Sequence, residues 1–274
     1  MKQSFALEFG KPAVIAALHL PPSPASGHPA SVDIEQATDY ALNNAAKAVK
    51  VGIPALYIQD LGDFPINPHV QPDTVARMSV IGSALRKEFP HLALGVCMMA
   101  HAAKEPLAVA EAIQANFVRI KVYVGTMVRA EGILQGCAHE AVAYRHQLSA
   151  DQINIFADVY DRTGQPLGRM PIEEEARQAA VFGRADGIVL TGLSVEESQS
   201  MLKAVAAAKL GTPLILGGGA NAQNLKDFVP LCNAIIVSSA FKTSSGWTRE
   251  AMTTPWDLGK MNQFMDAWSE AVNN

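Results

Sequence analysis

Eight short apolar runs, each followed by a longer amphipathic stretch, divide this sequence of 274 residues from one end to the other. Every run has the length of a strand and is rich in Val, Ile, Leu and Ala, as is typical of strands buried on both faces. The runs start at Ala13, Ile53, Leu92, Phe117, Ile153, Ala185, Thr212 and Asn233.

The stretches between these runs carry helical signals. In residues 31–51 the apolar side chains form one stripe, Ser31 stands at the N-cap position and Gly52 stops the helix. Several stretches begin with Pro or Ser and end near Gly, which is the usual asymmetry of helix ends. The further predicted helices are 72–89, 105–116, 132–148, 171–182, 194–210, 221–228 and 255–272.

Eight strand–helix units in about 250 residues are typical of a closed (β/α)8 barrel. We therefore predict an α/β fold in which residues 1–274 form a single TIM-barrel domain. A doubly wound open sheet has the same alternation, but no G-x-G-x-x-G follows the first run. The glycine run follows the seventh strand instead, where phosphate-binding barrels place theirs.

Composition removes several classes of function. With 49% hydrophobic and 18% charged residues the chain is not disordered, and a net charge of −4 without a Lys/Arg cluster argues against a nucleic-acid partner. The three cysteines, Cys97, Cys137 and Cys232, form no C-x-x-C pair, which indicates reduced thiols. The first apolar run is too short to span a membrane, and no signal peptide is visible. We expect a cytoplasmic protein without membrane insertion.

The strongest candidate site lies at the ends of the seventh and eighth strands. Glycines let the backbone approach an anion closely, and a helix that starts near Asn221 would add unpaired N–H groups. The alternative is a tight turn packed for steric reasons. The predicted phosphate-binding residues are Gly218, Gly219, Ser238, Ser239 and Lys242.

The fourth run carries alternating polar residues, Arg119, Lys121 and Tyr123. By the period of two they share one face of a strand, and that face has to be the barrel interior because the other face packs against helices. The structural alternative is a buried ion pair with Asp60 or Asp158, and it also places these side chains inside the barrel.

Further polar residues end the other strands. His19 suits a general acid or base, a metal ligand or a hydrogen-bonded structural residue. Asp60 is favoured as a functional carboxylate, whereas Asp63 is favoured as part of a turn. Asp158 ends the fifth strand as another carboxylate. The third and sixth units contribute Met99, His101 and Thr191.

Several motifs, in this order and spacing, resemble the BtpA/SgcQ family over nearly the whole chain. They are AVIAALHLP from Ala13, Arg119 with GILQGCA from Gly132, ADV from Ala157, DGIVLTG from Asp186, SSAFK from Ser238 and D-x-x-K-x-x-x-F-M from Asp257. The resemblance implies a phosphate-binding TIM barrel. Members of this family are linked to photosystem I biogenesis, or to sugar uptake and phosphorylated-sugar metabolism. Two rim segments depart from the family pattern: Gln59-Asp60 stands in place of Glu-Asn, and Tyr160-Asp161-Arg162 in place of Lys-His.

The favoured hypothesis is an isomerase, aldolase or lyase for a small phosphorylated sugar or nucleoside derivative, with no required cofactor. In it Arg119 and Lys121 position or polarise the substrate, Lys121 is able to form a Schiff base, and His19, Asp60 or Asp158 moves a proton. Two alternatives stay open. One is a non-enzymatic assembly or stabilising factor for a membrane complex, and the other is a metal-dependent hydrolase that uses His19, Asp60 and Asp158.

Two C-terminal features complete the predictions. Trp256, Phe264 and Trp268 in the last helix are expected to pack on the barrel or on a second copy in a homo-oligomer. The polar loop over residues 243–254 suits a lid over the mouth or a flexible insertion.

Overall fold

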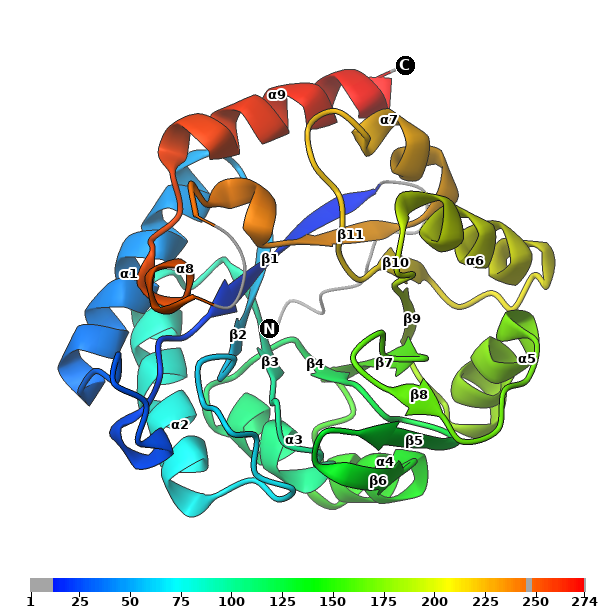
Figure 1. The fold of residues 1–274 in the computed structure, drawn as a ribbon, viewed down its shortest axis with the longest axis horizontal. Helices are drawn as coiled ribbons and strands as arrows, with labels where there is room; N and C mark the ends of the chain where they lie inside the picture. The colour runs from blue at the N-terminus through cyan, green and yellow to red at the C-terminus, as the bar shows by residue number, and fades with distance from the viewer. Residues whose placement is uncertain (1–11, 245–247, 274) are drawn as a thin grey trace.

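Eight parallel strands close into a barrel at the centre of the molecule (Figure 1). The computed structural model describes residues 12–244 and 248–273. Because each barrel strand comes from one of the eight apolar runs, the predicted (β/α)8 barrel is confirmed and the open-sheet alternative is wrong. In order around the barrel the strands are β1 (Ala13–His19), β11 (Ala234–Val237), β10 (Leu214–Leu216), β9 (Gly187–Leu190), β7 (Asn154–Val159), β4 (Phe117–Ile120), β3 (Ala93–Cys97) and β2 (Ala55–Gln59).

The barrel closes at its first strand. β1 lies parallel to β11, with Ala13 opposite Ala234, and parallel to β2, with Ile15 opposite Ala55. Closure leaves no free strand edge, and all eight strands run in the same direction. Their carboxyl ends therefore meet at one mouth, which is where barrels of this type place their chemistry.

Apolar side chains cover both faces of the barrel, which explains why the strands read as continuous apolar runs. The inner layer includes Tyr57, Phe117 and Phe156, and the rings of Phe117 and Phe156 stack with their centroids 4.8 Å apart. The outer layer fills the space between the strands and the surrounding helices. The inner layer thus forms a packed floor beneath the mouth.

The helices form a ring around the barrel (Figure 1). The N-cap of α1 is Asp33, whose Oδ1 accepts a hydrogen bond from the backbone N–H of Gln36 at 2.8 Å, so the prediction of Ser31 as the cap is wrong. The helices are α1 (Ile34–Lys50), α2 (Pro72–Glu88), α3 (Lys104–Ala112), α4 (Ala138–Gln147), α5 (Ile172–Arg177), α6 (Val195–Ala207), α7 (Leu225–Phe228), α8 (Arg249–Thr253) and α9 (Leu258–Asn273). Three short 3₁₀ helices and one π-helix complete the elements: the 3₁₀ helices are η1 (Pro24–Ser26), η3 (Val229–Leu231) and η4 (Ser239–Phe241), and the π-helix is η2 (Gln178–Phe182).

A small antiparallel sheet follows the carboxyl ends of β4 and β7. It consists of β5 (Thr126–Arg129), β6 (Gly132–Gln135) and β8 (Gln165–Pro166), with β5 in the middle. The prediction of one helix over 132–148 is therefore wrong in its first part, since α4 begins only at Ala138. Met127 and Leu134 are buried while their neighbours Val128 and Ile133 are exposed, and this period of two belongs to a strand.

The helix predicted over 221–228 is shortened to the single turn α7. Before it, Asn221 and Asn224 bind each other: Asn221 Oδ1 accepts from the Asn224 N–H at 3.1 Å, and Asn224 Oδ1 accepts from the Asn221 N–H at 2.8 Å. Because α7 begins only at Leu225 and is a single turn, we do not count a helix N-terminus among the donors of the phosphate site. The site depends on the N–H groups of the loop itself.

The aromatic residues of the C-terminal segment pack inside this chain. Trp256 and Phe264 are each 1% exposed and Trp268 is 9% exposed, and Phe241 meets Trp256 and Phe264 edge to face. Of the two predicted roles, packing on the barrel is confirmed. A homo-oligomer contact through these aromatics is wrong, because the protein's own core already covers them.

Within the described ranges, no helix combines the length and the apolar content needed to cross a lipid bilayer.

Candidate functional site

A cavity of about 330 Å³ opens at the mouth of the barrel. Nine of the ten predicted site residues line it, and Asp60 does not. The nine are His19, Arg119, Lys121, Asp158, Gly218, Gly219, Ser238, Ser239 and Lys242. The cationic fourth strand and the glycine loop therefore face one common space, as the sequence predicts.

The glycine loop after β10 presents bare backbone to this cavity. Gly218 has φ +155° and Gly219 has φ +89°, conformations that favour glycine. The backbone N–H groups of Gly218, Gly219 and Ala220 donate no hydrogen bond within the described part of the chain. Successive unpaired donors on a glycine loop are the features of an anion-binding nest.

The alternative explanation of the glycine run, a tight turn that needs glycine for steric reasons, applies to Gly217 but not to Gly218 or Gly219. A Cβ on Gly217 would stand 2.0 Å from Thr191 Oγ1 and 2.7 Å from Val189 Cγ1, so packing alone requires glycine there. By contrast, a Cβ on Gly219 would meet no atom of the described residues within 4 Å. The space over the last two glycines is open rather than packed.

The residues after β11 complete one side of this space. Ser238 and Ser239 line the cavity, and the Ser239 N–H makes no hydrogen bond within the described residues. Lys242 Nζ donates to the carbonyl of Ala251 at 2.8 Å, and burial lowers the Lys242 pKa to about 8. An ammonium group and free N–H donors thus lie beside the glycine loop.

His19, at the end of β1, lies between the glycine side and the cationic strand. Its Nδ1 is 3.3 Å from Ser238 Oγ. Burial, and then the charges of Lys242, Lys121 and Arg119, lower the His19 pKa to about 3. At neutral pH the imidazole is therefore uncharged, and it is suited to hydrogen bonding with a substrate oxygen.

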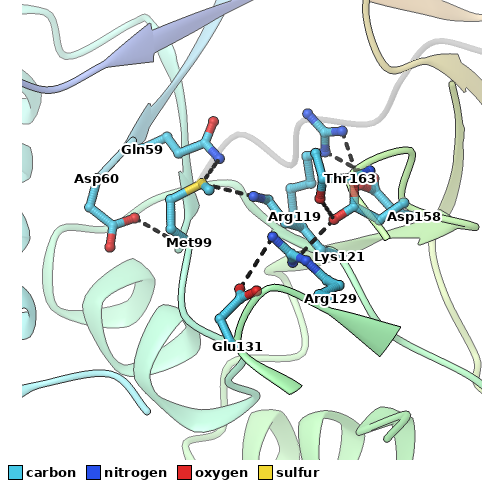
Figure 2. A network of polar contacts seen from close by, with 10 residues as sticks. Gln59, Asp60, Met99, Arg119, Lys121, Arg129, Glu131, Asp158 and Thr163 are labelled. Carbon is cyan, nitrogen blue, oxygen red and sulfur yellow. Dashed lines mark hydrogen bonds and ion pairs between the residues drawn. The ribbon is translucent and has the colours of Figure 1, made fainter. Parts of the chain in front are cut away.

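Arg119 and Asp158 form a two-pronged ion pair on the cavity floor (Figure 2). Arg119 Nε lies 2.9 Å from one Asp158 oxygen, and Arg119 Nη2 lies 3.0 Å from the other. Arg119 Nη1 also donates to the Tyr57 hydroxyl at 2.8 Å. Burial alone would lower the Arg119 pKa, but Asp158 and Tyr57 hold it well above its ordinary value. The guanidinium is a fixed positive charge.

Lys121 brings a primary amine to the wall of the cavity. Its Nζ lies 2.8 Å from the sulfur of Met99, and it makes no ion pair within the described residues (Figure 2). Because β4 ends at Ile120, the strand does not continue to Tyr123. The placement of Tyr123 in the barrel interior is wrong: its buried hydroxyl donates to the Gly183 carbonyl in the outer layer.

The second strand gives structural rather than cavity-lining carboxylates. Asp60 Oδ1 accepts from the Met99 N–H at 2.7 Å, and burial raises the Asp60 pKa to about 6. Asp63 Oδ1 accepts from the Ser23 N–H at 2.6 Å, as suits its predicted place in a turn. His101 contacts the Gln135 carbonyl and lies outside the main cavity. Asp60 therefore holds the segment that carries Met99.

Sequence reasoning missed the contribution of the β7–β8 turn. Asp161, Arg162 and Thr163 line the cavity, although they stood out only as a departure from the family pattern. Asp161 pairs with Arg129 of the small sheet at 3.2 Å, and Arg129 lies 3.3 Å from Glu131 (Figure 2). The D-R-T-G turn at this strand end was the available signal, but its partner Arg129 lies before the predicted helix over 132–148, in residues that the sequence pattern assigned to no element.

The described residues contain no group of three or more His, Cys, Asp or Glu side chains placed to hold a metal ion. Asp158 is engaged by Arg119 and Asp60 by Met99, so His19, Asp60 and Asp158 do not form such a group. The metal-dependent hydrolase hypothesis gains no support from this arrangement.

A comparison with known sequences finds relatives that align with nearly the whole of this chain. The sequence profile of the BtpA family matches residues 10–269. The photosystem I biogenesis protein BtpA of Synechocystis is 30% identical over 267 residues, covering 95% of this chain and 89% of that protein. An uncharacterized protein of Pyrococcus horikoshii is 28% identical, covering 86% of this chain and 90% of that protein.

Solved structures with the same fold include enzymes. A structure titled native KDPGal has a TM-score of 0.58 at 14% identity, covering 95% of this chain and 96% of that one. The structure of KGPDC of Streptococcus mutans in complex with a phosphorylated sugar has a TM-score of 0.56 at 13% identity, and the match covers 94% of this chain and 98% of that one. Phosphoribosyl anthranilate isomerase of Thermus thermophilus has a TM-score of 0.54 at 14% identity, and the match covers 94% of this chain and 98% of that one. At such identities the likeness establishes the barrel fold alone.

Proposed function

Since this chain belongs to the BtpA family, we propose that it is an enzyme of that family which acts on a small phosphorylated metabolite at the mouth of its barrel. A sugar phosphate or a nucleoside phosphate is the substrate class. Two solved neighbours, one in complex with a phosphorylated sugar and one named for a phosphoribosyl substrate, support this class by analogy of fold.

One observation carries the proposal. Three successive backbone N–H groups, those of Gly218, Gly219 and Ala220, are unpaired within the described chain and border an open cavity. Ser239 and Lys242 border the same cavity and supply a further N–H and a positive charge. Unpaired donors are costly unless water or a ligand satisfies them, and a phosphate dianion accepts several hydrogen bonds at once.

The rest of the cavity suits chemistry at a carbonyl or hydroxyl group. Arg119 is held by Asp158 as a fixed cation, so it orients a substrate oxygen rather than exchanging protons. Lys121 has an amine without a carboxylate partner in the described residues, and such an amine polarises a carbonyl or condenses with it. Neutral His19 donates a hydrogen bond to a developing oxyanion. These roles fit an isomerase, aldolase or lyase that needs no cofactor.

The site is tested by a glycine substitution with a matched control. Gly219→Ala places a methyl group in the open space over the donors, whereas Gly211→Ala makes the same change at φ +75° with nothing within 4 Å and outside the cavity. Both variants place a side chain at a positive φ, where L-residues are strained. In the wild type and Gly211→Ala, a phosphorylated sugar at a hundredfold excess over its Kd adds about 2.7 kcal/mol of stability. Thermal unfolding with and without ligand is the measurement.

In Gly219→Ala we expect most of this ligand stabilisation to disappear, while the melting temperature without ligand falls as in Gly211→Ala. Unphosphorylated sugars should stabilise none of the three proteins. If a panel of sugar phosphates and nucleoside phosphates, with and without divalent metal, leaves the wild type unchanged, the enzyme proposal is overturned.

A second candidate is a non-enzymatic assembly or stabilising factor for a membrane complex. The name of the Synechocystis relative favours it, and so do the exposed apolar side chains Val128 and Ile133 of the small sheet and Leu167 directly after it. A factor of this kind would bind its partner equally well after substitution of Arg119 and Lys121. It would gain no stability from phosphorylated ligands.

A cytoplasmic location is part of the enzyme proposal. Cys97, Cys137 and Cys232 are free thiols, and Cys97 and Cys232 are buried. Reduced cysteines fit a reducing compartment.

A further inference from the structure

We propose that Arg162, on the turn between β7 and β8, closes the phosphate site from the side opposite the glycine loop. This inference rests on the proposed function and deepens it, because it adds a residue that selects a doubly charged phosphate group. Arg162 belongs to neither the glycine loop nor the strand that follows it, and sequence reasoning gave it no role in binding.

Arg162 lies close to the glycine loop. Its Nη2 is 4.0 Å from the point where a Cβ on Gly218 would stand, and among the described residues other than Gly218 and its two chain neighbours no other atom comes that close. The guanidinium therefore lies directly over the open side of the loop. The cavity is lined by Arg162 and by Gly218 together.

Arg162 also has no partner among the residues that the structure describes. Arg119 is paired with Asp158, and Arg129 with Asp161. Arg162 is exposed and makes no hydrogen bond or ion pair within the described residues. A partnerless guanidinium beside unpaired N–H donors leaves a set of groups that all require the same kind of ligand, an oxyanion.

Hydrogen bonds and an ion pair hold the backbone on each side of Arg162. The Asp161 carboxylate accepts from the Thr163 N–H at 3.0 Å and from the Thr163 hydroxyl at 2.8 Å, and it pairs with Arg129. The Gly164 N–H closes the turn on the Asp161 carbonyl at 3.1 Å. Burial would raise the Asp161 pKa, but Lys121, Arg129 and Thr163 lower it, so the anchor stays ionised. The turn therefore holds the Arg162 backbone in place, while no hydrogen bond or ion pair within the described residues ties down the Arg162 side chain.

Chemistry then identifies what this arrangement binds. A phosphate monoester has three terminal oxygens. In this proposal the loop N–H groups donate to oxygens on one side of the phosphate group, and the planar guanidinium contacts the other side with two parallel hydrogen bonds. Arg162 and Lys242 together match the two negative charges of the dianion. A carboxylate has two acceptor oxygens and a hydroxyl group has one, so each satisfies fewer of these donors than the three terminal oxygens of a phosphate monoester.

Isothermal titration calorimetry near neutral pH tests the inference with inorganic phosphate, D-ribose 5-phosphate and unphosphorylated ribose. The variants are Arg162→Gln, Arg162→Lys and the control Arg184→Gln. Arg184 is also exposed, and it precedes β9, so it lies at the end of the barrel away from the mouth. The control removes the same net charge without touching the cavity.

We expect Arg162→Gln to weaken binding of phosphate and of ribose 5-phosphate by about tenfold to a hundredfold, as for loss of a charged hydrogen-bond partner. Arg162→Lys should recover only part of the affinity, because lysine keeps the charge but not the planar fork. Arg184→Gln should bind as the wild type does. Affinity for ribose should be negligible in all four proteins.

The outcomes separate the two proposals. If the wild type binds phosphate and Arg162→Gln binds it equally tightly, Arg162 plays no part and the inference is overturned while the phosphate site stands. If Arg184→Gln weakens binding as much as Arg162→Gln does, the effect is long-range charge and the inference is again overturned. If the wild type binds neither phosphate nor ribose 5-phosphate, the proposed function itself fails.

Discussion

At the scale of single residues, Lys242 makes ligand binding depend on pH. Burial lowers its pKa to about 8, so the free protein loses this positive charge as the pH rises through that value. The second ionisation of a phosphate monoester has a pKa of about 6, so the ligand stays a dianion over the same range. His19, with a pKa of about 3, does not titrate there. We expect the affinity for ribose 5-phosphate to fall several-fold between about pH 7 and pH 9.

The matching variant is Lys242→Arg, because a guanidinium keeps its proton throughout this range. Its affinity should stay nearly flat where that of the wild type declines, and calorimetry in buffers of different ionisation enthalpy should show proton uptake on binding only in the wild type. An identical decline in both proteins would mean that Lys242 does not contribute its charge to the ligand.

The positions of single side chains could be predicted from the sequence where the alternation of one strand alone determines which way they point. Arg119 lies on β4, and Lys121 follows that strand closely enough to keep the alternation, so both reach the cavity. Tyr123 lies beyond the strand, where a period of two no longer applies. Asp60 turns to the Met99 N–H instead of the cavity, and a contact between neighbouring strand ends cannot be read from either segment alone.

At the scale of elements, the beginning of α1 shows how local capping chemistry decides a boundary. Asp33 and Gln36 form a reciprocal capping box: the Asp33 side chain accepts from the Gln36 N–H, and the Gln36 side chain accepts from the Asp33 N–H at 3.3 Å. The Ser31 side chain makes no hydrogen bond in the described structure. Ser and Asp are both good caps, so residue type did not distinguish them, but the Gln three residues after Asp33 did.

We expect Asp33→Ala to lower the free energy of unfolding by about 1 kcal/mol, which is typical for loss of a helix cap. Ser31→Ala, a matched truncation two residues earlier, should change it by less than about 0.5 kcal/mol. Urea denaturation followed by circular dichroism measures both. Equal losses in the two variants would mean that the capping box does not stabilise α1.

The small sheet is the element that sequence reasoning did not foresee. A (β/α)8 pattern predicts a helix after each strand, and this expectation led residues 132–137 to be read as the start of α4. The period of two in β5 and β6 was present, but each strand is only four residues long. Its consequence reaches the site, because Arg129 at the end of β5 anchors Asp161 and thereby the turn that carries Arg162.

At the scale of the whole molecule, the fold was predictable because the same unit recurs eight times and each unit buries its strand on both faces. The repetition says nothing about how the last unit meets the first. In the structure α1 holds the segment before α9 at several points: Tyr40 donates its hydroxyl to the Thr254 carbonyl at 3.1 Å, and Lys47 donates to the Trp256 carbonyl at 2.7 Å. Between them, Asn44 Oδ1 accepts from the Trp256 N–H at 2.7 Å.

Asn44 is the buried centre of this junction, and its removal tests whether the junction stabilises the closed barrel. Asn44 is 0% exposed, and its Nδ2 also donates to the Tyr40 carbonyl at 2.7 Å. Asn44→Ala leaves the Trp256 N–H without a partner in the interior, which costs about 1–3 kcal/mol. Asn43→Ala, next to it on the exposed face of α1, is the control and should cost less than about 0.5 kcal/mol. Because the junction joins elements more than 200 residues apart, tryptophan fluorescence and circular dichroism should report the same shifted urea midpoint for Asn44→Ala. If the two variants unfold alike, the barrel closes through its strand pairing alone and the contact between α1 and Trp256 adds nothing to its stability.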